Sequence, residues 1–245
     1  MKNVYCLFEQ SGTFKNEFKK LGFNSFDYDL KNDFGETDVV VDLFIEIEKA
    51  FIGEHSFFDC VSSDDLLFAF FPCIRFENQI MLSFRGQAYQ YQNYSLREKM
   101  VVDMDLMESL NHYYQILNKL CIICIDRHFK LIIENPFSKE HFLYRYWCFT
   151  ASIVDMDRRE SGDYFKKPTQ FWFLNINPQC NFVPEAIEYN AIVANDFCGD
   201  GYRDRKSEDF KITGANSIRV GRSMISSAYA NRFIKQYILE SVNDD

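Results

Sequence analysis

The chain has 245 residues and a net charge of −9, and 47% of its residues are hydrophobic and 26% charged. This length and composition support one well-buried α/β core, or at most two small domains, and exclude a disordered or low-complexity protein. The negative charge disfavours a broad basic face for DNA, because phosphate neutralisation supplies much of the affinity of such faces. A local basic cleft remains compatible with it.

The eight cysteines do not predict a disulfide framework. Cys121 and Cys124 have zinc or redox spacing, but they lie in an apolar stretch with helical periodicity and have no second pair at a suitable distance. They are interpreted as buried helix residues. No secretory signal opens the chain, and no apolar run reaches the ~20 residues of a membrane span. The sequence therefore predicts a cytoplasmic protein without a membrane segment or a metal site.

The first half alternates short apolar runs with amphipathic stretches, the pattern of βαβ units. Strands are predicted at residues 4–8, 25–28, 39–41, 66–71, 131–133 and 171–176. A helix with Phe14 and Phe18 on one face should end at Gly22, which suits a helix C-cap. These elements predict an α/β fold with a mixed, mostly parallel sheet and helices on both faces.

Two further helices are expected, at residues 96–127 and 227–239. In the first, apolar residues from Met100, Met104 and Met107 to Cys124 recur at helical spacing and are interpreted as a core-facing stripe. Basic residues form two groups, which are interpreted as solvated charged faces: Arg158, Arg159, Lys166 and Lys167, and Arg203, Arg205, Lys206, Arg219 and Arg222.

Two early features fit a cofactor site. Phe8-Glu9-Gln10-Ser11-Gly12 follows the first strand and leads into a helix, where backbone amides can approach a cofactor. Asp27 and Asp29 stand at the end of the second strand, and either one could accept ribose hydroxyl protons. An ordinary strand–helix turn and a solvated strand end are the alternative interpretations.

Two later features fit chemistry on a substrate. Pro72-Cys73 follows a buried strand, at the end where open α/β sheets place their active sites. Glu134-Asn135-Pro136 puts a carboxyl at the tip of the next predicted strand, close enough for Glu134 to approach Cys73. A buried acid can hold a proton and donate it to a ring nitrogen. A packed cysteine and a structural Asn-Pro turn are the alternatives.

In this order, the glycine turn, the acidic strand end, Pro72-Cys73 and Glu134-Asn135-Pro136 resemble the motifs of the DNA cytosine-5 methyltransferase family. The resemblance covers residues 1–176 and about 217–239, the last part being similar to the family's closing C-terminal helix. It implies a Rossmann-like S-adenosyl-L-methionine-dependent methyltransferase domain formed by residues 1–176 and 217–245. Residues 177–216 would be a short irregular insertion in place of a target-recognition domain.

The resemblance also implies roles for individual residues. Cys73 would attack C6 of a cytosine as a thiolate, and Glu134 would protonate or hydrogen-bond N3. Arg75 would contact a phosphate or the target nucleotide, although pairing with a surface carboxylate is equally compatible. The cofactor would be held by Phe8, Glu9, Ser11, Gly12, Asp27, Asp29, Asp42 and Pro72, with Asp42 at the adenine amino group.

One departure from the family concerns the strand that carries Gln-x-Arg-x-Arg. Here Gln170 is kept, but Trp172 and Leu174 replace the two arginines, the first of which helps to hold the cytosine ring. Lys167-Pro-Thr-Gln-Phe-Trp172 resembles a looser group of relatives with a Lys-x-Thr-x-x-Trp pattern. The substrate-binding set is therefore expected to be Asn135, Lys167, Thr169 and Gln170, with Lys166 and Arg75 as further candidates for orienting the base.

Two other departures keep alternatives open. Residues 177–216 are too few for the usual recognition domain, so a short or single-stranded target, or a protein partner or homodimer, is compatible with the sequence. Glu9 and Ser11 stand in the cofactor turn where small residues would be comfortable. The leading hypothesis is a nucleic-acid methyltransferase, with DNA favoured over RNA. The alternatives are a catalytically inactive, methyltransferase-like regulatory protein of a phage or mobile element, and a pyrimidine nucleotide-modifying enzyme.

Overall fold

A single mixed sheet organises the part of the chain that the computed structural model describes, residues 1–187 and 223–240. Its strand order is β3-β2-β1-β4-β5-β7-β6. The strands are β1 (Asn3–Leu7), β2 (Asn24–Asp29), β3 (Val39–Val40), β4 (Leu66–Ala69), β5 (Lys130–Pro136), β6 (Ile153–Asp155) and β7 (Thr169–Leu174). The helices are α1 (Thr13–Lys20), α2 (Leu43–Phe51), α3 (Asn78–Phe84), α4 (Leu96–Asp126), α5 (Phe142–Tyr146) and α7 (Ser227–Phe233), which continues as a π-helical turn, η6 (Ile234–Ile238). Short 3-10 turns are η1 (Phe57–Cys60), η2 (Tyr89–Tyr91) and η3 (Arg158–Ser161).

The sheet is parallel from β3 to β5 and antiparallel beyond it. β1 pairs in parallel with β2 and with β4, and β4 pairs in parallel with β5. β7 lies antiparallel between β5 and β6. The α/β class and the mostly parallel mixed sheet predicted from the sequence are thus confirmed. The sequence did not predict β6, α3 or α5, which are three, seven and five residues long and too short for a clear periodicity.

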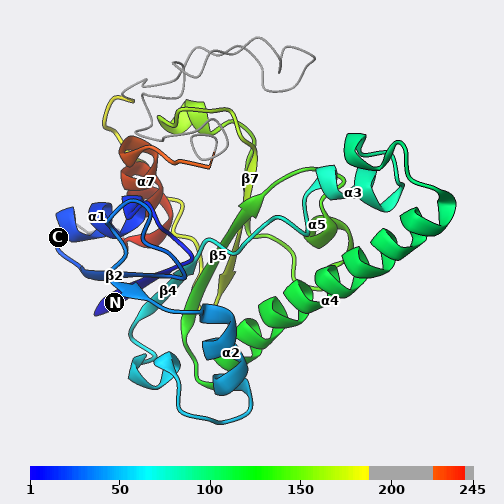
Figure 1. Cartoon of the computed structure of the whole chain (residues 1–245). Coiled ribbons are helices and arrows are strands. Elements are labelled where there is room, and N and C mark those ends of the chain that lie inside the picture. Colours follow the sequence, from blue (N-terminus) through cyan, green and yellow to red (C-terminus); the bar gives the residue numbers. More distant parts are fainter. Residues whose placement is uncertain (188–222, 241–245) are drawn as a thin grey trace.

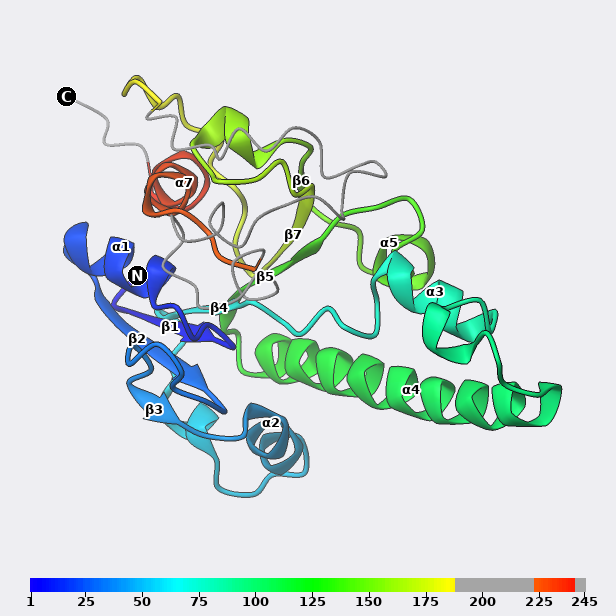
Figure 2. The same cartoon turned by 45° about the horizontal axis from the view of Figure 1, so that its top comes forward.

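Helices α1 and α7 cover one face of the sheet (Figures 1 and 2). Phe14 and Phe18 of α1 are fully buried there, as the apolar spacing of that helix predicted. The ring of Phe233 from α7 packs 4.3 Å from Phe171 of β7 and 6.0 Å from Phe14, measured between centroids. Aromatic contacts of this kind join the two ends of the chain, because burying large rings strongly favours the packed state.

Helices α2 and α4 cover the opposite face (Figure 1). α2 begins at Asp42, whose carboxylate accepts hydrogen bonds from the amides of Phe44 (3.0 Å) and Ile45 (3.4 Å). Such an N-cap satisfies amides that have no partner within the helix. Leu117 and Leu120 of α4 are fully buried against the sheet.

The first half of α4 departs from the sequence prediction. Met100, Met104 and Met107 are exposed at 58%, 71% and 53%, so they are not part of the core stripe. The helix runs well beyond the edge of the sheet, with α3 beside its projecting end (Figure 2). From Leu110 onward the stripe packs as predicted, and Leu110, Leu117, Cys121 and Cys124 are buried. Amphipathic spacing identifies a face of a helix but cannot tell how far the rest of the protein extends along it.

None of the described helices is long and apolar enough to span a membrane. No group of three or more His, Cys, Asp or Glu residues within 1–187 and 223–240 is arranged to hold a metal ion. Most of the insertion expected at residues 177–216, and the basic group around Arg203 to Arg222, lie outside the described residues.

Candidate functional site

A cavity of about 660 Å³ opens at the carboxyl end of the parallel strands. It lies where β1 separates β2 from β4, so the chain leaves β1 toward one side of the sheet and β4 toward the other. This reversal point leaves a crevice between the loops that follow β1 and β4, and open α/β sheets bind their ligands there. The walls come from the loops after β1, β2, β4 and β5, from the approach to β7, and from residues 223–225.

Most residues predicted for cofactor and catalysis meet in this cavity. Of the predicted set, Phe8, Glu9, Ser11, Asp29, Pro72, Cys73, Glu134 and Lys167 line it. Gly12, Asp27, Asp42, Arg75, Asn135, Thr169 and Gln170 are not among its lining residues. The sequence predicted the edge of the sheet at which the cavity lies. This was possible because an apolar run followed by polar residues indicates where a buried strand ends.

The thiol of Cys73 donates a hydrogen bond to Oε1 of Glu77, across 2.8 Å. Burial is the main cause that raises the pKa of this thiol, and the charge of Glu77 raises it further. Lys167 is the cation that opposes them. Cys73 is therefore a protonated thiol with a carboxylate in place to receive its proton. The sequence offered no sign of this pairing, because a Glu four residues after a cysteine is common in any helix-forming stretch.

Glu134, at the end of β5, is 7% exposed, and burial raises its pKa. Its Oε1 atom is buried without a hydrogen-bond partner among the described residues, and it lies 3.9 Å from Nη1 of Arg158. Lys167 and Arg158 oppose the effect of burial. A carboxyl with a raised pKa on a residue that lines a cavity can hold a proton and present it to a ligand.

In the turn after β1, the carboxylate of Glu9 binds backbone amides at the start of α1. Glu9 is 6% exposed, and its carboxylate accepts hydrogen bonds from the amides of Phe14 (2.8 Å) and Lys15 (3.3 Å) at the start of α1. Burial raises the pKa of Glu9 to about 7 despite these bonds. Phe8 just before it has a left-handed backbone, with a φ of 63°, which is rare for an aromatic residue and typical of functional turns. The α1 amides that could face an anionic ligand are therefore already occupied.

The two acids of β2 have different positions. Asp29 lines the cavity and accepts hydrogen bonds from Gln10 Nε2 (3.1 Å) and from the amide of Lys31 (2.9 Å). Asp27 is fully buried beneath, and neither of its carboxyl oxygens has a hydrogen-bond partner among the described residues. Burial, and then the charge of Glu9, raise the pKa of Asp27 to about 8.

Three further predicted residues serve local structure. Gly12 precedes α1 with a φ of 63°, and an added Cβ would lie 2.9 Å from the Cβ of Glu36. Asp42 caps α2, as described above. Arg75 turns toward α4 and donates from Nε to Oγ of Ser109 at 2.7 Å. It does not line the cavity, and it forms no ion pair with a carboxylate of the described residues.

The predicted substrate-binding residues apart from Lys167 are fully buried next to the cavity and do not line it. Asn135 donates from Nδ2 to the carbonyl of Phe71 (2.7 Å), which joins the tip of β5 to the loop of Cys73. Gln170 donates to the carbonyl of Pro136 (2.7 Å) and contacts His141 Nδ1 (3.2 Å), which fixes the same tip from the side of β7. Both side chains are fully buried.

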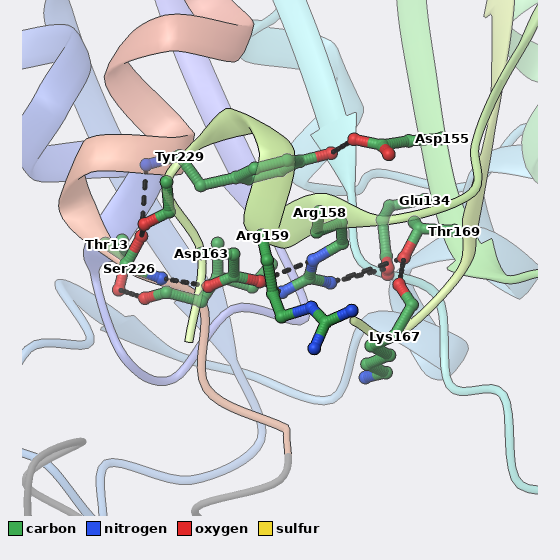
Figure 3. A network of polar contacts seen from close by, with 12 residues as sticks. Thr13, Glu134, Asp155, Arg158, Arg159, Asp163, Lys167, Thr169, Ser226 and Tyr229 are labelled. Carbon is green, nitrogen blue, oxygen red and sulfur yellow. Dashed lines mark hydrogen bonds and ion pairs between the residues drawn. The ribbon is translucent and has the colours of Figure 1, made fainter. Parts of the chain in front are cut away.

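Arg158 overturns the interpretation of its basic group as solvated. The side chain is fully buried, and its guanidinium pairs with Asp163 (Figure 3). Arg159 beside it binds Asp157, with 2.6 Å between Nη2 and Oδ2. Lys167 lines the cavity. No local pattern marks Arg158 for burial, because its partners come from the loop after η3, from β5, from β7 and from α7.

No protein-family model matches this chain, and no curated protein matches it significantly.

Proposed function

We propose that this protein is an S-adenosyl-L-methionine-dependent cytosine-5 methyltransferase that acts on nucleic acid, with DNA as the first substrate to test. One observation carries the proposal. Cys73 and Glu134, at the ends of adjacent parallel strands, line the same cavity as the turn after β1 and the acid that ends β2. This is the set of groups that covalent methylation of a pyrimidine needs around one ring.

The architecture supports a Rossmann-like methyltransferase fold. The parallel part of the sheet has its reversal point between β1 and β4, and the antiparallel β7 lies between β5 and β6. The residues before and within β7 then reach the same edge as the carboxyl ends of the parallel strands, so Lys167 lies across the cavity from the β1 turn. A sheet built in this way can receive a cofactor and a base from opposite sides of its reversal point.

The cavity suits the cationic cofactor at its nucleoside and sulfonium end. Asp29 stands where ribose hydroxyls would find an acceptor, and Phe8, Ser11 and Pro72 would contact the rest of the nucleoside. When bound, S-adenosyl-L-methionine supplies an electrophilic methyl group. Because Glu9 occupies the first amides of α1, the amino-acid carboxylate of the cofactor must find its donors elsewhere.

The chemistry assigned to the chain's own residues follows from their contacts. Cys73 Sγ attacks C6 of the pyrimidine while its proton passes to Glu77, and a carbon–sulfur bond forms. Glu134, protonated, lines the cavity, hydrogen-bonds N3 and stabilises the negative charge that develops on the ring. After methylation of C5, a water molecule accepts the C5 proton, and the electron pair of that bond re-forms the C5–C6 double bond and expels Cys73 as a thiolate, which takes its proton back from Glu77.

A second function has support from a specific observation. The carboxylate of Glu9 fills the amide positions at the start of α1, and the pKa of Cys73 is raised rather than lowered. Both features are what a methyltransferase-derived binding protein without turnover would tolerate. This protein would retain the fold and the cavity walls but would bind a partner instead of transferring a methyl group.

Transfer of labelled methyl groups from S-adenosyl-L-methionine separates these functions. The substrates are duplex DNA, single-stranded DNA, RNA and pyrimidine mononucleotides, and the Cys73→Ala protein is assayed beside the wild type. We expect label in a polynucleotide and a loss of at least about a thousandfold in the variant. Label confined to mononucleotides would identify a nucleotide-modifying enzyme. No label from a folded wild-type protein would reject the enzyme in favour of the binding protein, and an active Cys73→Ala would reject the covalent mechanism.

A further inference from the structure

The guanidinium of Arg158 lies at the centre of a buried polar network (Figure 3). Its Nε donates to Oδ2 of Asp163 at 2.5 Å, and Nη2 pairs with the same carboxylate. Nη1 donates to Oγ1 of Thr169 at 3.3 Å. The ring of Tyr229 lies 5.0 Å from the guanidinium carbon. Arg158 and Asp163 are both fully buried, so each would be costly in this position without the other.

Glu134 approaches the same guanidinium without a hydrogen bond to it. Its Oε1 lies 3.9 Å from Nη1, close enough for strong attraction at low dielectric but too far for a hydrogen bond. This oxygen has no hydrogen-bond partner among the described residues. The arrangement therefore attracts the carboxyl group through its buried oxygen, while Glu134 itself lines the cavity.

Asp163 connects this pair to the other wall of the cavity. Its Oδ1 accepts from the amide of Ser226 at 2.8 Å, while the hydroxyl of Ser226 donates to the carbonyl of Gly162 at 2.7 Å. Ser226 is also the N-cap of α7, and its hydroxyl accepts from the amide of Tyr229 at 3.0 Å. The three residues just before Ser226 line the cavity. One carboxylate thus binds the arginine with one oxygen and the start of α7 with the other.

We propose that Arg158 is the positioning residue of the site: it holds Glu134 at the cavity wall and, through Asp163, sets that acid relative to the segment 223–226. This inference rests on the proposed function for the role of Glu134 as the acid. In this arrangement Arg158 supplies a fixed positive charge beside Thr169, at the start of β7. Because Arg158 does not line the cavity, it acts through Glu134 and not on the substrate.

The arrangement predicts opposite effects of the two partners on Glu134. The charges that act on this carboxyl are those of Lys167 and Arg158, which lower its pKa, and of Asp163 and Glu77, which raise it together with burial. Arg158→Gln removes a cation and should raise the pKa of Glu134. Asp163→Asn leaves the arginine without its counter-ion and should lower the pKa. A role in packing alone gives no reason for opposite shifts.

The test is a titration of the glutamate side-chain carboxyl carbons by NMR, in protein labelled at that carbon, with the Glu134 signal identified by its absence in Glu134→Gln. We expect Arg158→Gln to increase the proton affinity of Glu134 at least tenfold, Asp163→Asn to decrease it, and Arg158→Lys to stay close to the wild type. Shifts of the same sign, or no shift in folded Arg158→Gln and Asp163→Asn, would overturn the proposal. If one variant does not fold, the direction of the Glu134 pKa shift in the other variant still tests the proposal.

The titration does not depend on activity, so it separates this inference from the proposed function. If the wild type transfers no methyl group to any substrate, the proposed function fails while the role of Arg158 in setting Glu134 is still measured. If the wild type is active, the pH profile of kcat should shift in the same direction as the Glu134 titration in each variant. A pH profile that does not move with the titration would overturn the inference that Arg158 acts through Glu134.

Discussion

The thiol of Cys73 and the carboxylate of Glu77 form a hydrogen-bonded pair, with 2.8 Å between Sγ and Oε1, at the wall of the cavity. A cysteine needs its thiolate form to act as a nucleophile, yet burial and the charge of Glu77 both raise its pKa. The pair therefore keeps the cysteine unreactive toward solvent electrophiles, and in the proposed mechanism Glu77 would be the base when Cys73 attacks a bound substrate.

Glu77→Gln should separate these two roles. Without the negative charge the pKa of Cys73 falls, so we expect its alkylation by iodoacetamide at pH 8 to be faster, by about tenfold for each unit of pKa. Methyl transfer should instead become slower, by about 10²–10⁴-fold, because the proton acceptor is lost. Alkylation is measured at Cys73 by mass spectrometry. The exposed Glu140→Gln is the control, and parallel changes in both rates would contradict the assignment of Glu77 as the base.

Asn135 should stabilise the site through its contact with the Cys73 loop. Its Nδ2 bonds to the carbonyl of Phe71 in a fully buried position. Asn135→Ala leaves that carbonyl without this donor, and we expect a loss of about 1–3 kcal/mol in the free energy of unfolding, measured by urea denaturation. Asn177→Ala, at an exposed position, should change stability by less than about 0.5 kcal/mol. Equal effects of the two substitutions would contradict this structural role.

Asp27 should make the protein less stable as the pH rises. Its pKa is about 8 in the folded chain, where burial and Glu9 disfavour the charged form, and its ordinary value is 3.8. A raised pKa means that the stabilising contribution is complete below the unfolded value and is lost as the pH rises toward the folded one. The free energy of unfolding of Asp27→Asn should therefore rise relative to that of the wild type between pH 5 and pH 8. The expected change is about 1–2 kcal/mol after allowance for solvent screening.

The measurement for Asp27 is urea denaturation at several pH values across this window. Asp64→Asn, which removes a solvent-exposed carboxylate paired with Lys2, serves as the control and should follow the wild-type dependence. A constant difference between Asp27→Asn and the wild type from pH 5 to pH 8 would show that Asp27 ionises normally in the folded protein.

Buried and exposed residues of α4 should respond differently to truncation. Leu110 is 5% exposed, so Leu110→Ala should cost about 2–4 kcal/mol of unfolding free energy through lost burial and the cavity left behind. Met104 is 71% exposed, and Met104→Ala should stay within about 0.5 kcal/mol of the wild type. Thermal denaturation of both variants tests this. A large loss with Met104→Ala would indicate that its side chain is covered in solution.

Much of the site's location could be predicted because it depends on where strands end. The apolar run before Pro72-Cys73 and the one before Glu134 identify two buried strands, and parallel strands bring their carboxyl ends to one edge. Phe8, Ser11 and Asp29 follow from the same reasoning, and all of them line the cavity. Gly22 ends α1 with a φ of 88°, as its position after the last apolar residue predicted.

The remaining features depend on contacts that no local pattern contains. Arg158 has the sequence context of a surface residue, and it is buried because Asp163, Thr169 and the ring of Tyr229 surround it in the fold. Met104 has the spacing of a core residue, and it is exposed because α4 extends beyond the sheet. The sequence by itself determined most of the longer elements, the α/β class and the edge that carries the cavity, since these follow from periodicity and turn residues. Only the tertiary structure decided which charges are buried, which thiol meets which carboxylate and which helix face is covered, because those depend on residues brought together from distant parts of the chain.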